Sequence, residues 1–167
     1  LASKSRAKIF GVGINPHSLV GVSSTSEITL QPAAPEVAGE GLNFDVESAT
    51  DNSKWLNYSS IIDNSANSIS VALDGDNLPE GVTIELVASS DAGNGIGEVG
   101  ESTVKPVVLG KTQLELISGI KNCYTGKGEN AGHQLIYSLK MEQTSDNYKA
   151  LTSGSFSTTV IYTITEN

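Results

Sequence analysis

Apolar and β-branched side chains occupy every second position near the end of the chain, and this is the clearest pattern in the sequence. The alternating residues are Phe156, Thr158, Val160, Tyr162 and Ile164. Successive side chains of a strand point to opposite faces, so this pattern predicts a strand that turns one face toward a core. The last segment of the chain is therefore expected to lie within a sheet.

Shorter alternating runs, bounded by clusters of Gly, Pro, Asn, Asp and Ser, recur along the rest of the chain. With the terminal segment 155–165 they predict nine strands, the others being residues 27–31, 42–46, 55–62, 68–73, 82–88, 104–109, 112–117 and 133–141. Apart from residues 114–120, which also fit a short helical turn, no helical periodicity is present. Many short strands separated by turn residues indicate an all-β sandwich or barrel.

The N-terminal part of the chain differs from this body. Residues 31–41 hold two prolines and two glycines and are expected to form a crossover between an arm, residues 1–26, and a single sandwich domain, residues 27–167. The arm carries an apolar stretch at residues 7–14 and a second at 19–22. An unpaired apolar strand invites edge-to-edge association. The arm is therefore expected either to fold back as the first strand of its own sandwich or to insert into another copy.

Charge is placed unevenly along the chain. Residues 27–101 hold fourteen of the 19 acidic residues and a single base, Lys54, whereas Lys4, Arg6 and Lys8 make the first residues basic. So acidic a body argues against nucleic-acid binding, which requires Lys and Arg to displace phosphate counterions. The basic arm is either a solvated tail or a segment that meets acidic protein. No apolar run approaches the roughly 20 residues needed to cross a bilayer, so membrane insertion is not expected.

Residues suited to catalysis are few. Cys123 is the single cysteine, so it forms no internal disulfide and is expected to be a packed core residue. Only His17 and His133 can serve as a base, and a pair of Cys123 with His133 would lack an orienting acid. We expect a non-enzymatic protein. The chain begins with Leu1, which suggests that it has been trimmed and makes secretion plausible.

Ligand-binding motifs are weak. Residues 95–100 formally match the glycine-rich dinucleotide fingerprint, but Pro106 lies where the required helix would run, so a glycine loop is expected. Weak calcium candidates lie in one turn: Asp74, Asp76, Asn77 and Glu80. Their spacing does not fit the twelve-residue calcium loop, and turn formation explains the same residues. No cofactor is predicted. Most aromatic residues fall in predicted strands, which leaves Tyr124 and Tyr148 in loops.

The arm, the crossover and the terminal sequence Ser155-Phe-Ser-Thr-Thr-Val-Ile-Tyr-Thr-Ile-Thr165 together resemble bacterial pilus and surface-fibre subunits of the immunoglobulin-like, donor-strand kind. The segment 117–139 is similar to small secreted β-rich proteins of Bacteroidota. The resemblance implies an immunoglobulin-like β-sandwich that lacks a strand and has a groove, which the N-terminal strand of the next subunit fills. By position, the donor residues are Lys8, Ile9, Phe10, Val12 and Ile14, with Val22 as the furthest extension. The acceptor groove strand carries Phe156, Thr158, Val160, Tyr162 and Ile164.

Two functions follow as hypotheses. The first is a secreted structural subunit of an extracellular fibre or pilus, a homopolymer in which each subunit donates its N-terminal strand to an identical neighbour. The alternative is a self-contained cell-surface binding module, a carbohydrate- or calcium-dependent adhesin domain, with the arm in its own sheet. An esterase or peptidase is a distant third.

Overall fold

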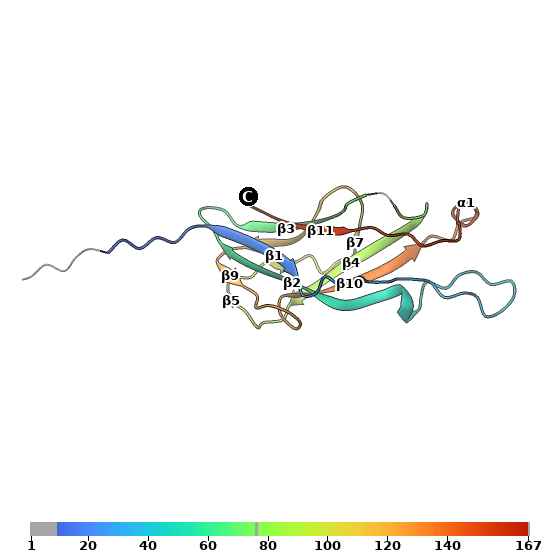
Figure 1. The fold of residues 1–167 in the computed structure, drawn as a ribbon, viewed down its shortest axis with the longest axis horizontal. Coiled ribbons are helices and arrows are strands. Elements are labelled where there is room, and N and C mark those ends of the chain that lie inside the picture. The colour runs from blue at the N-terminus through green and yellow to red at the C-terminus, as the bar shows by residue number, and fades with distance from the viewer. Residues whose placement is uncertain (1–9, 76, 167) are drawn as a thin grey trace, which may run out of the picture.

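The computed structural model describes residues 10–75 and 77–166. Two antiparallel sheets form the fold, which confirms the predicted all-β layered architecture (Figure 1). The larger sheet contains, in spatial order, β5 (Ile96–Gly97), β9 (Cys123–Tyr124), β2 (Thr50–Ile61), β10 (His133–Met141), β4 (Val82–Asp91) and β7 (Val107–Val108), with β1 (His17–Val22) on β2. The smaller sheet has the order β11 (Val160–Glu166), β3 (Asn67–Leu73), β8 (Leu114–Ile120) and β6 (Glu101–Ser102).

Helical structure is limited to two short elements in the described residues. The 3-10 helix η1 (Glu47–Ala49) precedes β2, and α1 (Ser145–Lys149) lies between β10 and β11. The Thr144 side chain caps α1 by accepting a hydrogen bond from the backbone N–H of Asn147. A helix of five residues is too short to show a helical period, which explains why the sequence pattern did not indicate it.

The core lies between the sheets and consists of the alternating faces of the longer strands. Ile69, Val71 and Leu73 of β3 are buried, as are Leu86 of β4 and Leu135 of β10. Alternating side chains become buried when both sheets turn their apolar faces inward. Each fully buried side chain of this size contributes about 1.5–3 kcal/mol relative to exposure.

Strands predicted at residues 27–31 and 42–46 are absent, so that prediction is wrong. The structure has only a single bridge in this region, between Ala33 and Asn43. An alternating sequence forms a strand only where another backbone lies alongside it, and the backbone of residues 27–30 has no backbone hydrogen-bond partner among the described residues. The predicted strand 155–165 also begins later, at Val160.

The predicted arm divides into two parts. Residues 17–22 form β1 and pair antiparallel with β2 of the same subunit, from His17 opposite Ile61 to Val22 opposite Leu56. Residues 10–16 have no assigned strand and extend away from the body (Figure 1). The earlier residues of the proposed donor strand, Lys8 and Ile9, lie outside the described residues.

Candidate functional site

The candidate site is a groove that opens between the edges of the two sheets. Strands β1 and β11 are in contact, but the segment that follows Val22 and the segment that precedes Val160 diverge. Between them lies a cavity of about 410 Å³. The apolar side chains that line it come from both edges and from the sheet below: Val22, Ile28, Leu30, Leu78, Ile84, Leu139, Phe156 and Val160.

The floor of the groove belongs to the inward faces of β4 and β10. Leu86 and Leu135 on these strands are buried, whereas Ile84 and Leu139, which are opposite each other in the strand register, are only half-buried. The same alternating faces are therefore fully covered at one end of the sandwich and only partly covered at the other.

Both flanks of the groove have unpaired backbone. β11 pairs with β3 along one edge and stands last in its sheet, so its other edge has no strand partner among the described residues. Residues 27–30 on the opposite flank also lack backbone partners within the described chain. Exposed edges of this kind are templates for the addition of a strand.

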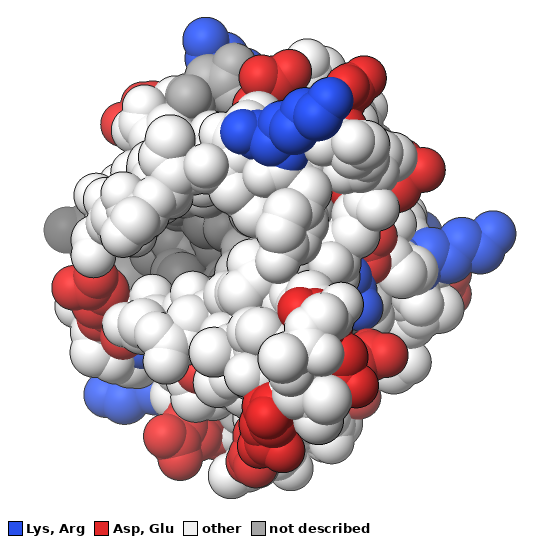
Figure 2. Space-filling model, turned by 90° about the vertical axis from the view of Figure 1, so that its right-hand side faces the viewer, with Lys and Arg blue, Asp and Glu red and all other residues white. Residues whose placement is uncertain are grey.

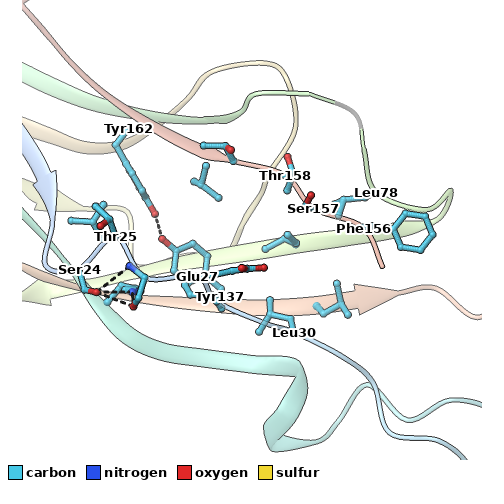
Figure 3. Close-up of a pocket in the computed structure, with 18 residues that line it drawn as sticks. Ser24, Thr25, Glu27, Leu30, Leu78, Tyr137, Phe156, Ser157, Thr158 and Tyr162 are labelled. Carbon is cyan, nitrogen blue, oxygen red and sulfur yellow. Dashed lines mark hydrogen bonds between the residues drawn. The ribbon is translucent and has the colours of Figure 1, made fainter. Parts of the chain in front are cut away.

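Two tyrosines connect the sheets across one end of the groove. The hydroxyl groups of Tyr137 on β10 and Tyr162 on β11 are hydrogen-bonded to each other (Figure 3). Burial raises the pKa of Tyr137 to about 12, because the phenolate would lose its hydration. Burial and the neighbouring Tyr137 also raise the pKa of Tyr162 far above its ordinary value. Both hydroxyl groups therefore stay protonated at neutral pH.

Lys54 is buried beside the same end of the groove. It lies on β2 and has 4% of its surface exposed. Its Nζ donates hydrogen bonds to Oγ of Ser24 at 3.1 Å and to Oγ of Ser26 at 2.7 Å. These two serines follow β1, at the place where the chain leaves the sheet. The ammonium thus fixes the first residues of the diverging flank.

A second hollow continues the groove toward Leu151, which follows α1 in the chain. Helix α1 lies at one end of the molecule (Figure 1). Leu42, Phe44 and Leu151 line it, and it shares Leu30 and Phe156 with the groove. The loop containing Leu42 is held to the segment around α1, because the side-chain amide of Gln143 donates to the Leu42 carbonyl at 2.9 Å. Figure 2 looks onto this end of the molecule and shows a hollow in its surface.

The predicted acceptor residues lie on this groove, with one exception. Phe156, Thr158, Val160 and Tyr162 line it, whereas Ile164 packs against the core further along β11. In Figure 3, Phe156 lies at the end of the groove opposite Tyr162. The described donor residues lie elsewhere and are all exposed, with Phe10 at 82%, Val12 at 87% and Ile14 at 77%.

Sequence reasoning missed Lys54, Tyr137 and Ile84 as groove residues. Tyr137 and Ile84 lie in the predicted strands 133–141 and 82–88, and a partly covered stretch of a core-facing strand has the same sequence pattern as a covered one. Lys54 did carry a signal, since it is the only base between residues 27 and 101. Lys54 is buried beside Ser24 and Ser26, and the sequence alone does not predict that these two serines lie next to it.

Cys123 and His133 do not form a catalytic pair. Both ring nitrogens of His133 have other partners, Tyr58 Oη at 2.8 Å from Nε2 and the Ser89 carbonyl at 2.8 Å from Nδ1. Because a carbonyl only accepts, Nδ1 carries the proton and Nε2 accepts from Tyr58. Burial, assisted by the charge of Asp91, raises the pKa of the Cys123 thiol to about 11, so it stays protonated at neutral pH.

The two other candidate motifs lie in the loop between β3 and β4 and around β5. Asp74, Asn77 and Glu80 lie in the loop between β3 and β4, where the Asn77 side chain donates to the Ser157 carbonyl at 3.3 Å; Asp76 lies outside the described residues. Within residues 10–75 and 77–166, no three His, Cys, Asp or Glu side chains gather as a metal site. In the glycine-rich segment, a Cβ on Gly95 would lie 2.1 Å from the Tyr124 carbonyl oxygen, so glycine allows close strand packing there.

Comparisons with known proteins give no match: no family model, curated protein or solved structure is similar to this chain. Among the residues that the structure describes, no helix has the length and apolar character that crossing a membrane requires. The geometry of the groove and of the arm is therefore the basis for assigning a function.

Proposed function

We propose that this chain is a secreted structural subunit of an extracellular fibre or pilus, built as an immunoglobulin-like sandwich. Each subunit donates its N-terminal arm to the groove of an identical neighbour, and the homopolymer grows head to tail. The observation that carries this proposal is an open apolar groove with unpaired flanks in a chain that also has an exposed apolar arm.

The positions of arm and groove support contact between copies. Residues 10–16 project from one end of the molecule, and the groove continues toward the other end, where α1 lies (Figure 1). A neighbour placed end to end would bring its arm to this groove. Such a contact joins two different surfaces, so it propagates instead of closing on itself.

The sequence of the arm suits the groove. Phe10, Val12 and Ile14 alternate with Gly11 and Gly13, so a strand made of these residues has one apolar face and one face without side chains. The apolar face would cover Ile84 and Leu139. Burial of each apolar side chain contributes about 1.5–3 kcal/mol before the entropy cost of association is subtracted.

Charge also favours this pairing. The arm sequence carries Lys4, Arg6 and Lys8 and contains no acidic residue before Glu27. The body that would receive it has a large excess of acidic residues. Attraction between exposed charges weakens as salt is added, whereas apolar strand contacts do not weaken in this way. Salt is therefore expected to slow assembly more than it destabilises the finished fibre.

The test uses two variants of the full chain. Val12→Arg places a charge on the exposed arm and should prevent donation, whereas Thr158→Arg blocks the groove and should prevent acceptance. Each variant alone is expected to stay monomeric in analytical ultracentrifugation, and a mixture of the two should form discrete dimers. The control is Ile96→Arg, which changes another exposed apolar side chain, on β5 and outside the lining of the groove. Fibre formation by Val12→Arg alone, or failure of wild-type chains to associate at high concentration, would reject the proposal.

The alternative function is a self-contained surface binding module. The observation that favours it is β1, because this part of the predicted arm pairs with β2 of its own subunit. Leu19 of β1 and the exposed Tyr124 are both opposite Ser59 of β2 and so share the outer face of the sheet. A wild-type chain that remains monomeric, and whose binding to a carbohydrate array is lost in Tyr124→Ala, would favour this alternative.

A further inference from the structure

Lys54 has an unusual environment for a charged side chain. Only 4% of its surface is exposed, and its two hydrogen-bond partners are the uncharged hydroxyl groups of Ser24 and Ser26. In the described residues, the single ion pair within 4.0 Å is Lys121 with Glu98, so Lys54 forms no ion pair at that distance, although Glu27 also lines the groove. Removing an ammonium from water is costly unless its donors are all satisfied.

The groove therefore presents polar groups that lack partners. An ammonium has three N–H donors, and two of those on Lys54 are used. On the opposite flank, Oγ1 of Thr158 is buried and has no hydrogen-bond partner among the described residues. Both side chains line the same groove. An occupant that is apolar throughout would leave these groups unsatisfied, whereas one that carries hydrogen-bond acceptors would satisfy them.

The N-terminal arm offers one kind of acceptor at the required place. It contains no Asp or Glu, so it brings no carboxylate. Gly11 and Gly13 alternate with its apolar residues, and the space around both glycines is open. Because these residues have no Cβ, the neighbouring main-chain carbonyl groups can approach another molecule closely. Between Phe10 and Ile14 the arm has no polar side chain, so the acceptors that this stretch can supply to a buried ammonium are backbone carbonyls.

We propose that Lys54 binds a main-chain carbonyl of the incoming arm, between Phe10 and Ile14, and so makes the groove selective for an extended peptide. This inference rests on the proposed function, because it assumes that the occupant is the arm of a second copy. The hydrogen bond to a charged donor would lie within the groove, in contrast to the exposed contacts of the basic arm residues. It is expected to depend little on salt.

The experiment uses full-length protein in which Val12→Arg disables the arm and leaves the groove empty. The probe is a fluorescent synthetic peptide of residues 7–15, and its binding is measured by fluorescence anisotropy. Lys54→Met is expected to weaken peptide binding about tenfold or more, the usual effect of losing a hydrogen bond to a charged group. Lys54→Arg, which keeps a charged donor, should lose less affinity than Lys54→Met. Melting temperatures establish that the variants are folded.

A second measurement separates recognition from mere support of the groove wall. Replacing single amide bonds of the peptide by esters weakens the carbonyl at each chosen position. At one position between Phe10 and Ile14, the ester should weaken binding to the Lys54 protein and have a smaller effect on Lys54→Met.

Each outcome bears on one of the two proposals. Equal ester effects on both proteins, or unchanged affinity in Lys54→Met, would overturn the role of Lys54 and leave strand donation standing. If Lys54→Met does not fold, the ester series on the Lys54 protein decides alone, and absence of any sensitive position overturns the role. A peptide that binds none of the proteins overturns the proposed function itself.

Discussion

The hydroxyl group of Tyr137 on β10 is hydrogen-bonded to that of Tyr162 on β11, and this bond joins the two sheets beside the groove. It connects strands that do not pair with each other, since β10 lies in the larger sheet and β11 in the smaller. The bond therefore helps to set the separation of the sheets at the place where a donated strand would enter.

Removing one partner of this bond should destabilise the protein. Tyr162→Phe is expected to lower the free energy of unfolding by about 1–3 kcal/mol, because the Tyr137 hydroxyl stays buried without a partner. The double variant with Tyr137→Phe should lose less than the sum of the single variants. Urea denaturation of the monomer measures these values, with the exposed Tyr124→Phe as control. Strict additivity would show that the two hydroxyl groups are not coupled.

Stability should also decline at alkaline pH. Burial raises the pKa of Tyr137 to about 12, whereas an unfolded tyrosine titrates near 10. Above about pH 10 the unfolded chain loses protons that the folded chain retains, so the free energy of unfolding falls as pH rises. The double Phe variant should show a shallower decline in denaturation measured across this range. An identical slope in both proteins would contradict the assignment.

Acid is expected to act through His133. Burial lowers its pKa, although the Ser89 carbonyl and the charge of Asp91 act in the opposite direction. Below about pH 6.5, His133 therefore binds a proton more readily in the unfolded chain than in the folded chain. The free energy of unfolding is expected to decrease as pH falls through that value. Tyr58 stacks on the ring at 5.5 Å between centroids and offers no compensating charge.

The control for this acid effect is the exposed His17. His133→Gln should flatten the dependence of unfolding free energy on pH between about 7 and 5, whereas His17→Gln should not. Unfolding curves that keep the same pH dependence in His133→Gln would assign the acid effect to carboxylates elsewhere.

Cys123 is predicted to react slowly with iodoacetamide. Its side chain is buried, and its raised pKa of about 11 leaves little thiolate at neutral pH. Mass spectrometry should find slow alkylation of the folded protein and rapid alkylation in denaturant. Rapid modification of the native protein would revive the catalytic interpretation.

Strands β10 and β3 were predictable because both their ends and their faces are encoded locally. The predicted strand at residues 133–141 coincides with β10, and the one at 68–73 differs from β3 by a single residue. In both, alternation with period two is continuous and turn residues bound the run. Two-residue strands such as β5 and β9 have no such period, so nothing in their own sequence indicates them.

The groove was less predictable, because it depends on which strand lacks a neighbour. Residues 27–31 have the alternation of a strand, but residues 27–30 have no backbone partner in the described chain, and Ile84 has the pattern of a core residue but only partial cover. A single sequence shows where apolar and polar residues alternate, but it does not show which strands lie next to each other in the sheet. The resemblance to fibre subunits supplied the expectation of a groove, and the structure places Phe156, Thr158, Val160 and Tyr162 along one.

Because β1 is fixed to β2 immediately after Pro16, the short apolar segment before it is tethered far from the open side of its own molecule. The segment before β1 therefore cannot fill the groove of its own copy while β1 stays paired with β2. If copies join as proposed, the two ends of every fibre differ: one end has an empty groove, and the other has an N-terminal arm that is not bound. A new subunit would therefore add to one end through its arm and to the other end through its groove.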